Sequence, residues 1–381
     1  MKNSIKLVIP LLFITVLVYI IVTVLNKNSH REATGELIYY TLNNAPMAAA
    51  CVAHFKAHTV SGGMSSGTTS HYAEAINLQT GEVVWSTELS GQKGDWVSTN
   101  LLMAQSKAYF FYFLDGLIVV DKATGKIVAE TKDLEKENPA QKENFPSDPK
   151  KYYFNEPEQA ILFTRNDALC YVLNTNTLKT TVTSNKEIPR RLLQNTAICG
   201  YDAANGKFTG ILGEEDKEQL ENGYYYGGRT DENARRYLYK SSYTGLNKTG
   251  RGFIMDSLIK INDEPFIYGT FLTSTPLPDN VVRENPPVLH LAHPDAYIMI
   301  HQTSLATDAK MLISIVQPNG KIIRTIKTPL QGISSYHLYN RHLALAGTQK
   351  YGNITDLLYL DLTNGSAKGF TFNNQETYEI R

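Results

Sequence analysis

The chain has 381 residues, of which 42% are hydrophobic and 19% are charged, enough for one large core or two smaller ones. Lys plus Arg and Asp plus Glu are both 37, so the formal net charge is zero. Proteins that bind nucleic acid usually carry a basic excess, so we expect no nucleic-acid partner. Three cysteines exclude a small fold built on disulfides.

The N-terminal part predicts a membrane anchor. After a flank at 1–6, residues 7–25 are apolar and contain no charge, and a helix of that length approaches the ~30 Å hydrocarbon core of a bilayer. The run is longer than that of a cleaved signal, and no small-residue cleavage site follows it, so we expect an uncleaved single-pass anchor. Basic residues flank both sides, and we expect 1–6 in the cytoplasm, with the rest on the outer side of the inner membrane.

The sequence assigns 26–36 to a linker and 37–381 to the folded domain. In this domain β-rich runs alternate with Thr-Gly or Asn-Gly turns, which is typical of hairpins. The turn glycines Gly81 and Gly125 are 44 positions apart, and Gly320 and Gly365 are 45 apart, a spacing that matches one four-stranded propeller blade.

The pattern therefore predicts an all-β fold: a β-propeller of about seven four-stranded blades behind one transmembrane helix. Residues 37–42 are expected to supply a strand to the C-terminal blade, because such closure covers free sheet edges. The expected blade cores are 70–90, 97–133, 152–184, 190–213, 237–275, 288–328 and 334–372.

Polar stretches at 61–70, 135–150 and 213–236 interrupt the pattern and are expected to be loops, where binding residues concentrate. The last of them contains Tyr224, Tyr225, Tyr226 and Arg229. Tyrosine and arginine are typical of interface hot spots, so we expect an interaction site there. The alternative is that the tyrosines pack on a blade and Arg229 is solvated.

One repeat has a specific pattern. Its first copy consists of Ala75, Asn77, Thr80, Gly81 and Trp85, and a second copy has Asp121, Thr124 and Gly125, with Ala129 in place of the tryptophan. This pattern resembles the tryptophan-docking repeat of pyrroloquinoline-quinone (PQQ) type propellers. The resemblance implies that the Thr-Gly turn joins two strands, that the tryptophan packs between neighbouring blades, and that the chain is a non-catalytic member of that family.

The dehydrogenases of the family have eight blades, many docking tryptophans and often an adjacent cysteine pair. This chain has two tryptophans, and Cys51, Cys170 and Cys199 are dispersed. We therefore expect no PQQ and no other cofactor. Cys170 and Cys199 are expected to be two buried thiols, while their pairing stays open.

Other constellations are weaker. Gly63 to Gly67 fits the Gly-x-Ser-x-Gly nucleophile pattern, but no strand, elbow and helix surround it, which favours a loop. Cys51, His54 and His58 would share a helix face, but on a strand the two histidines lie ~13 Å apart, too far to bind one ion. His290 and His293 would point to opposite faces of a strand. We expect no metal.

The sequence thus predicts a membrane-anchored, non-catalytic propeller in the cell envelope. It is expected to act as a protein-interaction scaffold or a ligand-binding module whose partner is another envelope protein. The alternative is an envelope hydrolase or lyase with its site in the central funnel. That alternative needs His, Asp, Glu or Arg side chains from several blades to converge there.

Overall fold

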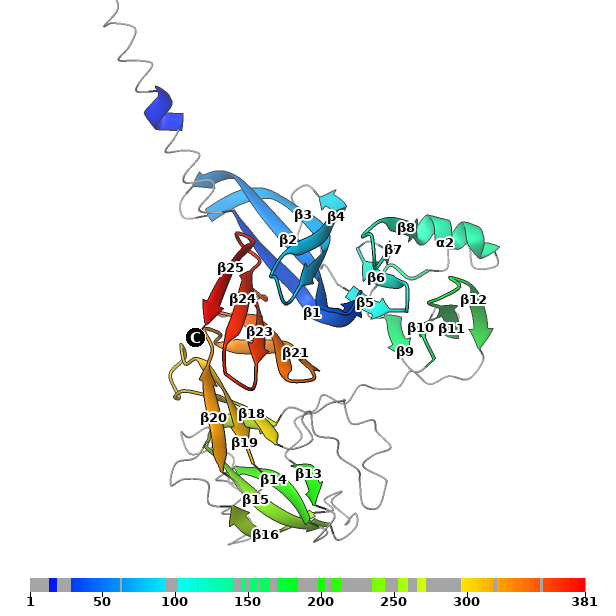
Figure 1. Cartoon of the computed structure of the whole chain (residues 1–381). Coiled ribbons are helices and arrows are strands. Elements are labelled where there is room, and N and C mark those ends of the chain that lie inside the picture. The colour runs from blue at the N-terminus through cyan, green and yellow to red at the C-terminus, as the bar shows by residue number, and fades with distance from the viewer. Residues whose placement is uncertain are drawn as a thin grey trace, which may run out of the picture. The chain divides into compact units, whose positions relative to one another are not determined.

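The computed structural model describes residues 14–18, 29–61, 64–92, 102–114, 116–139, 145–148, 151–155, 158–164, 170–183, 198–202, 207–213, 235–243, 253–259, 266–271, 296–317, 321–349 and 352–380 (Figure 1). The chain divides into two compact units. The first comprises 1–188 together with 353–357 and 370–378, and the second comprises the remainder.

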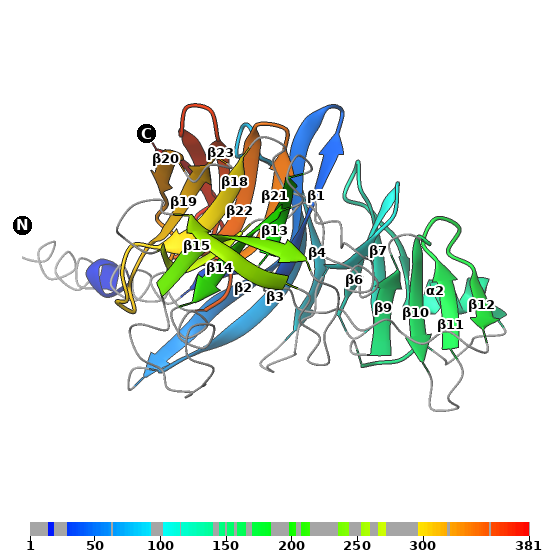
Figure 2. The same cartoon turned by 90° about the horizontal axis from the view of Figure 1, so that it is seen from below.

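The first unit contains three sheets of four antiparallel strands, and in each sheet neighbouring strands follow one another along the chain (Figures 1 and 2). The strands of the first sheet are β1 (His30–Leu42), β2 (Ala45–Ser61), β3 (Met64–Asn77) and β4 (Val83–Gln92). Those of the second are β5 (Leu102–Gln105), β6 (Tyr109–Phe113), β7 (Leu117–Asp121) and β8 (Ile127–Glu130). Those of the third are β9 (Tyr152–Asn155), β10 (Ala160–Thr164), β11 (Cys170–Asn174) and β12 (Thr180–Thr183).

The second unit contains an eight-stranded sheet in the order β13-β14-β15-β17-β18-β19-β20, with β16 paired to β15. Its strands are β13 (Ile198–Asp202), β14 (Lys207–Gly213), β15 (Arg235–Tyr243), β16 (Phe253–Ile259), β17 (Phe266–Phe271), β18 (Tyr297–Gln302), β19 (Met311–Val316) and β20 (Ile322–Lys327). A C-terminal sheet follows, whose residues are divided between the two units. Its strands are β21 (Gly332–Tyr339), β22 (His342–Thr348), β23 (Asp356–Asp361), β24 (Ala367–Thr371) and β25 (Glu376–Ile380).

The all-β prediction is confirmed, and the sheets are antiparallel. Four-stranded sheets whose strands follow chain order have the topology of propeller blades. The expected blades at 97–133 and 152–184 coincide with the second and third sheets, whereas the first sheet begins at His30 instead of residue 70. The expected blades at 190–213, 237–275 and 288–328 are not separate among the described residues, where their strands belong to one sheet.

The role expected for residues 37–42 is wrong. These residues lie in β1, which starts inside the expected linker 26–36 and pairs along its length with β2. The cause is the turn between the strands: Asn43 and Asn44 both have positive φ, 49° and 64°, as a two-residue type I′ hairpin requires. One isolated bridge, Ala33 to Ile354, links β1 to the segment before β23.

The expected anchor at 7–25 lies mostly outside the described residues. Within it, residues 14–18 are helical, and Ile14, Val16, Leu17 and Val18 are exposed. Among the described residues, no helix has the length and apolar character needed to cross a bilayer.

Four hairpin turns share one hydrogen-bond pattern. At the first, Gly81 N donates to Asn77 O, Asn77 N donates to Glu82 O, and the Asn77 side chain accepts from the amides of residues 79 and 80. The fifth residue has positive φ in each turn. The equivalent turns start at Asp121, Asn174 and Asp361, and their fifth residues are Gly125, Leu178 and Gly365, respectively.

A side chain from the preceding sheet docks on the second of these turns. The Trp85 indole lies against Gly125, its Nε1 donates to Lys122 O at 3.1 Å, and Thr87 Oγ1 donates to Gly125 O at 2.6 Å. Phe110 and Tyr112 extend this contact into a buried core between the first two sheets. Trp85 therefore packs between neighbouring sheets, as the repeat implies.

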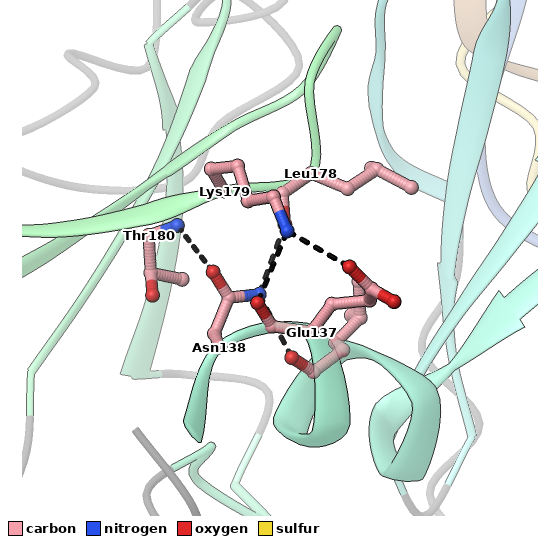
Figure 3. A network of polar contacts seen from close by, with 6 residues as sticks. Glu137, Asn138, Leu178, Lys179 and Thr180 are labelled. Atoms are coloured by element: carbon pink, nitrogen blue, oxygen red, sulfur yellow. Dashed lines mark hydrogen bonds and ion pairs between the residues drawn. The ribbon is translucent and has the colours of Figure 1, made fainter. Parts of the chain in front are cut away.

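The next junction uses a helix instead of a tryptophan. Helix α2 (Thr131–Glu137) begins in the expected blade at 97–133 and ends in the expected exposed excursion at 135–150. The Asp133 carboxylate caps its start by accepting from Glu130 N. Its C-terminal end docks on the turn that starts at Asn174, where Asn138 Nδ2 donates to Leu178 O and Asn138 Oδ1 accepts from Thr180 N (Figure 3). Lys179 Nζ donates to the Glu137 carboxylate at 2.8 Å (Figure 3).

A third junction uses an arginine. Arg324 is four positions after Gly320, as Trp85 is after Gly81. Its Nη1 donates to Asn364 O, and it lies 3.1 Å from the position that a Cβ on Gly365 would occupy. Trp85, the end of helix α2 and Arg324 thus each contact a hairpin turn of the neighbouring sheet.

Candidate functional site

The two faces of the first sheet differ in chemistry. Side chains alternate along a strand, so Ala73, Ala75 and Trp85 lie on the apolar face that packs against the second sheet. Ala75 is opposite Trp85 in the ladder, and Glu74 is opposite Ser86. Glu74, Ser86 and Arg31 form a polar cluster on the other face.

A buried ion pair forms the centre of this cluster. Arg31 Nη2 lies 2.5 Å from Glu74 Oε1, and the side chains are 15% and 1% exposed. Ser86 Oγ donates to the same carboxylate oxygen at 2.7 Å, and the guanidinium carbon is 5.4 Å from the centre of the Tyr72 ring. A charge removed from water must be compensated by such partners, because desolvation costs several kcal/mol per ion.

The compensation is incomplete among the described residues. Glu74 Oε2 and Arg31 Nε are buried and have no hydrogen-bond partner there. A third contact comes from the hairpin between β24 and β25, where Gln375 Nε2 donates to Glu74 Oε1 at 3.4 Å. Gln375 has a positive φ of 56°, a conformation that non-glycine residues adopt at some cost.

An open groove lies beside the ion pair. It has a volume of about 910 Å³ and is lined by Gly81, Glu82, Val83 and Val84 of the first turn and β4, and by Gln375, Glu376 and Thr377 at the start of β25. Gln375 is shared, since it lines the groove and also contacts Glu74. The groove therefore lies next to the Glu74 carboxylate, which is fully buried.

The groove suits an extended polypeptide with a basic side chain. Glu82 and Glu376 are exposed carboxylates on its two sides, and Val84, 49% exposed, offers an apolar contact. β4 and β25 are each the last strand of their sheet. Last strands are where an extended peptide adds to a sheet, with main-chain hydrogen bonds giving affinity and side-chain contacts giving specificity.

A second polar chain lies inside the eight-stranded sheet. His301 Nε2 is 2.8 Å from Ser314 Oγ, which is 2.8 Å from Thr325 Oγ1. Burial lowers the pKa of His301. A histidine beside a serine resembles a nucleophile and its base, but Ser314 has no exposed surface, so a substrate cannot reach its hydroxyl in this arrangement.

Lys122 is an unusual amine within the second turn. Its Nζ donates to Gln105 Oε1 at 2.7 Å and lies 4.9 Å from the centre of the Phe110 ring and 5.6 Å from that of Tyr40. Burial lowers the pKa of Lys122 to about 8. The ring faces oppose this shift, since they attract the ammonium form.

Of the site residues predicted from the sequence, some lie in hairpin turns and others lie outside the described residues. Tyr224, Tyr225, Tyr226 and Arg229 lie outside the described residues. Asn77, Thr80 and Gly81 form the first turn, and Asp121, Thr124 and Gly125 form the second, where Thr124 donates to the Asp121 carboxylate and holds its pKa below the usual value.

The cysteines and histidines considered as metal ligands do not gather. Cys51 lies on the apolar face in the core, whereas His54 is near Tyr72 and Arg31, with its pKa lowered mainly by burial. Within the part of the chain that the structure describes, no three His, Cys, Asp or Glu side chains form a metal-binding group. Cys170 is buried, and the Cys199 side chain is outside the description.

Sequence reasoning missed Arg31, Glu74 and Gln375. One signal was present: Glu74 stands between Ala73 and Ala75 in an otherwise apolar run, and a charged residue inside a buried strand requires a partner. Gln375 had no comparable signal, because its contact depends on the position of the C-terminal hairpin.

No protein-family model matches the chain, and no curated protein is significantly similar to it. Two solved structures align with most of it. Apo AztD from Citrobacter koseri is 10% identical, with 81% of this chain and 94% of that chain covered and a TM-score of 0.32. The β-propeller domain of Cps50 (Swd1) from Myceliophteria thermophila is 11% identical, with 93% and 98% covered and a TM-score of 0.25. Both TM-scores are below 0.5, so the fold assignment rests on the sheets themselves.

Proposed function

We propose that this protein is a non-catalytic β-propeller scaffold of the PQQ-like repeat type, anchored in the inner membrane by residues 7–25, with its sheets on the outer side. It binds an extended segment of another envelope protein in the groove between Glu82 and Glu376. The observation that carries the binding role is this groove, whose two walls bear carboxylates and an exposed valine. The propeller form is supported by four-stranded sheets in chain order and by the docking of Trp85 on Gly125.

Charge selects the ligand. Two exposed carboxylates favour a lysine or arginine in the bound segment, and Val84 favours an apolar residue next to it. Pairs at a solvent-exposed rim contribute modestly, about 0.2–1 kcal/mol each, so affinity must come mainly from main-chain pairing and apolar contact. A modest, salt-sensitive interaction is therefore expected.

The chemistry of the neighbouring groups supports binding in place of catalysis. The Glu74 carboxylate contacts Arg31, Ser86 and Gln375, which hold it in a fixed position. A general acid or base must lie within reach of a substrate, whereas the Glu74 side chain is only 1% exposed. The alternative, an envelope hydrolase or lyase, has no comparable cluster to support it among the described residues.

Photo-crosslinking in intact membranes tests the proposal. A photoreactive amino acid at Thr377, in the groove, should capture a partner that the same probe at Lys132 does not capture; Lys132 is exposed on α2. Glu82→Gln with Glu376→Gln should weaken capture, and higher salt should do the same. Equal capture from Thr377 and Lys132, or capture unaffected by the double variant, would contradict the groove. Alanine at Tyr224, Tyr225 and Tyr226 tests the other predicted contact separately.

A further inference from the structure

The hairpin of β2 and β3 is longer than the strands beside it. On one side the ladder between β1 and β2 ends at the pair His30–Phe55, and on the other side the ladder between β4 and β3 ends at Gln92–Thr69. Beyond these pairs, β2 and β3 pair with one another from Lys56–Thr68 to Ser61–Met64. This two-stranded ribbon projects past its sheet in both views (Figures 1 and 2).

The N-terminal segment leaves the sheet at the same end. β1 is antiparallel to β2, so the chain traced backwards from β1 runs alongside β2 toward the ribbon. The contact is direct, since Ala57 N donates to Ser29 Oγ at 3.1 Å. Ser29 is four positions after Leu25, the last residue of the apolar run, and four extended residues span at most about 14 Å.

The ribbon is long enough to cover that distance. From Ala57 to Ser61, β2 advances four residues, which is about 14 Å at the rise of a strand. If residues 7–25 span the bilayer, Ser29 lies at most about 14 Å from it, a distance that the ribbon beyond Ala57 matches.

The basic side chains of the ribbon favour contact with an anionic membrane surface. No Asp or Glu occurs between Glu36 and Glu74. Lys56 and His58 are exposed on the ribbon, and Lys27 precedes Ser29 in sequence, while His30 at the base of the ribbon lies 4.0 Å from the Glu32 carboxylate. Anionic lipid headgroups attract basic side chains close to a membrane surface, with a preference of about fivefold per lysine.

We propose that the ribbon formed by Lys56–Ser61 and Met64–Thr68 lies on the surface of the bilayer that holds the anchor, with Lys56 contacting anionic lipid headgroups. This inference rests on the anchoring part of the proposed function and is independent of the groove. The contact fixes the orientation of the first sheet relative to the membrane, because a single-pass tether of a few residues cannot do so by itself.

The full-length protein in lipid nanodiscs provides the test, with an environment-sensitive fluorophore attached at Ser66→Cys in a Cys199→Ser background. Ser66 is exposed on the ribbon, and Lys132→Cys on α2 is the matched control site. In nanodiscs with about one-third anionic lipid, the Ser66 label should shift to shorter wavelength and be quenched by spin-labelled lipid, while the control label should not. Lys56→Gln should reduce the bound-to-free ratio of the ribbon about fivefold.

The outcomes separate the two proposals. A Ser66 label as accessible to water as the Lys132 label, in protein that resists extraction by alkaline carbonate, overturns the ribbon inference and leaves the anchor. Equal shifts in neutral and anionic nanodiscs overturn the headgroup contact. Protein released by carbonate overturns the anchor and the ribbon inference with it.

Discussion

The Trp85 ring lies so close to Gly125 that a Cβ added to this glycine would be 2.6 Å from Trp85 Cδ2. Gly125 also has a φ of +72°, which costs an alanine about 1–2 kcal/mol. Overpacking adds about 1–3 kcal/mol. Gly125→Ala should therefore lower the free energy of unfolding by about 2–5 kcal/mol, as measured by urea denaturation followed by circular dichroism.

Gly365→Ala is the matched control for that variant. Its φ is +84°, but the nearest atom is Arg324 Nη1 at 3.1 Å, the end of a flexible side chain. Gly365→Ala should therefore lower the free energy of unfolding mainly by the cost of positive φ, about 1–2 kcal/mol, with little added by overpacking. Combining Gly125→Ala with Trp85→Ala should give less than the sum of the single losses. Strict additivity would show that the indole does not pack on this turn.

Removing one partner of the Arg31–Glu74 pair should lower the free energy of unfolding strongly, whereas replacing both partners with apolar residues should change it little. Glu74→Ala leaves a guanidinium that is only 15% exposed without its carboxylate, and such losses are about 3–5 kcal/mol. Arg31→Met combined with Glu74→Leu should recover most of the stability, since apolar pairs of similar volume are often neutral. Denaturation of the single and double variants gives the coupling energy. A double variant as unstable as Glu74→Ala would argue against this account.

Stability should fall in mild acid because of buried histidines. Burial lowers the pKa values of His71 and His301 below the ordinary 6.5. The unfolded chain then binds more protons than the folded chain as the pH drops below about 6.5, so the free energy of unfolding decreases there. Melting temperatures measured from pH 7.5 to pH 5 should decline. The melting temperature of the His71→Gln variant should decline less steeply with falling pH. Parallel curves of melting temperature against pH for the variant and the wild type would rule out a contribution from His71.

Lys122 should be an unusually reactive amine. With a pKa of about 8, roughly half of it is neutral at pH 8, whereas an ordinary lysine is almost fully charged there. Even though the amine is half-buried, brief acetylation at pH 8 should modify Lys122 about tenfold faster than an ordinary exposed lysine, as read by peptide mass spectrometry. The advantage should shrink at pH 10. A rate at Lys122 equal to or below that of the exposed lysines would contradict the expectation.

The parts of the fold that the sequence predicts well are those with local causes. Thr80-Gly81 and Thr124-Gly125 are turns because glycine accepts the positive φ and the residue at the start of each turn accepts two amide hydrogen bonds. The turn ending at Leu178 has the same geometry with φ +56° but carries no glycine to reveal it. Asn43-Asn44 is a local signal for a type I′ hairpin, and the hairpin it forms places the start of the first sheet at His30, forty residues before the expected blade at 70–90.

The candidate site was harder to predict because its members are distant in sequence. Arg31 and Glu74 are 43 positions apart, and Gln375 is 301 positions from Glu74. No local pattern records such pairings. Helix α2 was difficult to predict for another reason. It has only seven residues, too few to show a helical periodicity in the sequence. Its docking through Asn138 stabilises it.

The junctions between sheets have a further consequence. Trp85, the end of α2 and Arg324 each meet a turn of the same construction with a different chemical group. Repeated units with identical seams are prone to joining the wrong neighbour while they fold. Here each junction has its own chemical group. A sheet placed beside the wrong neighbour would therefore lack the matching contact at the turn, which disfavours mispaired arrangements.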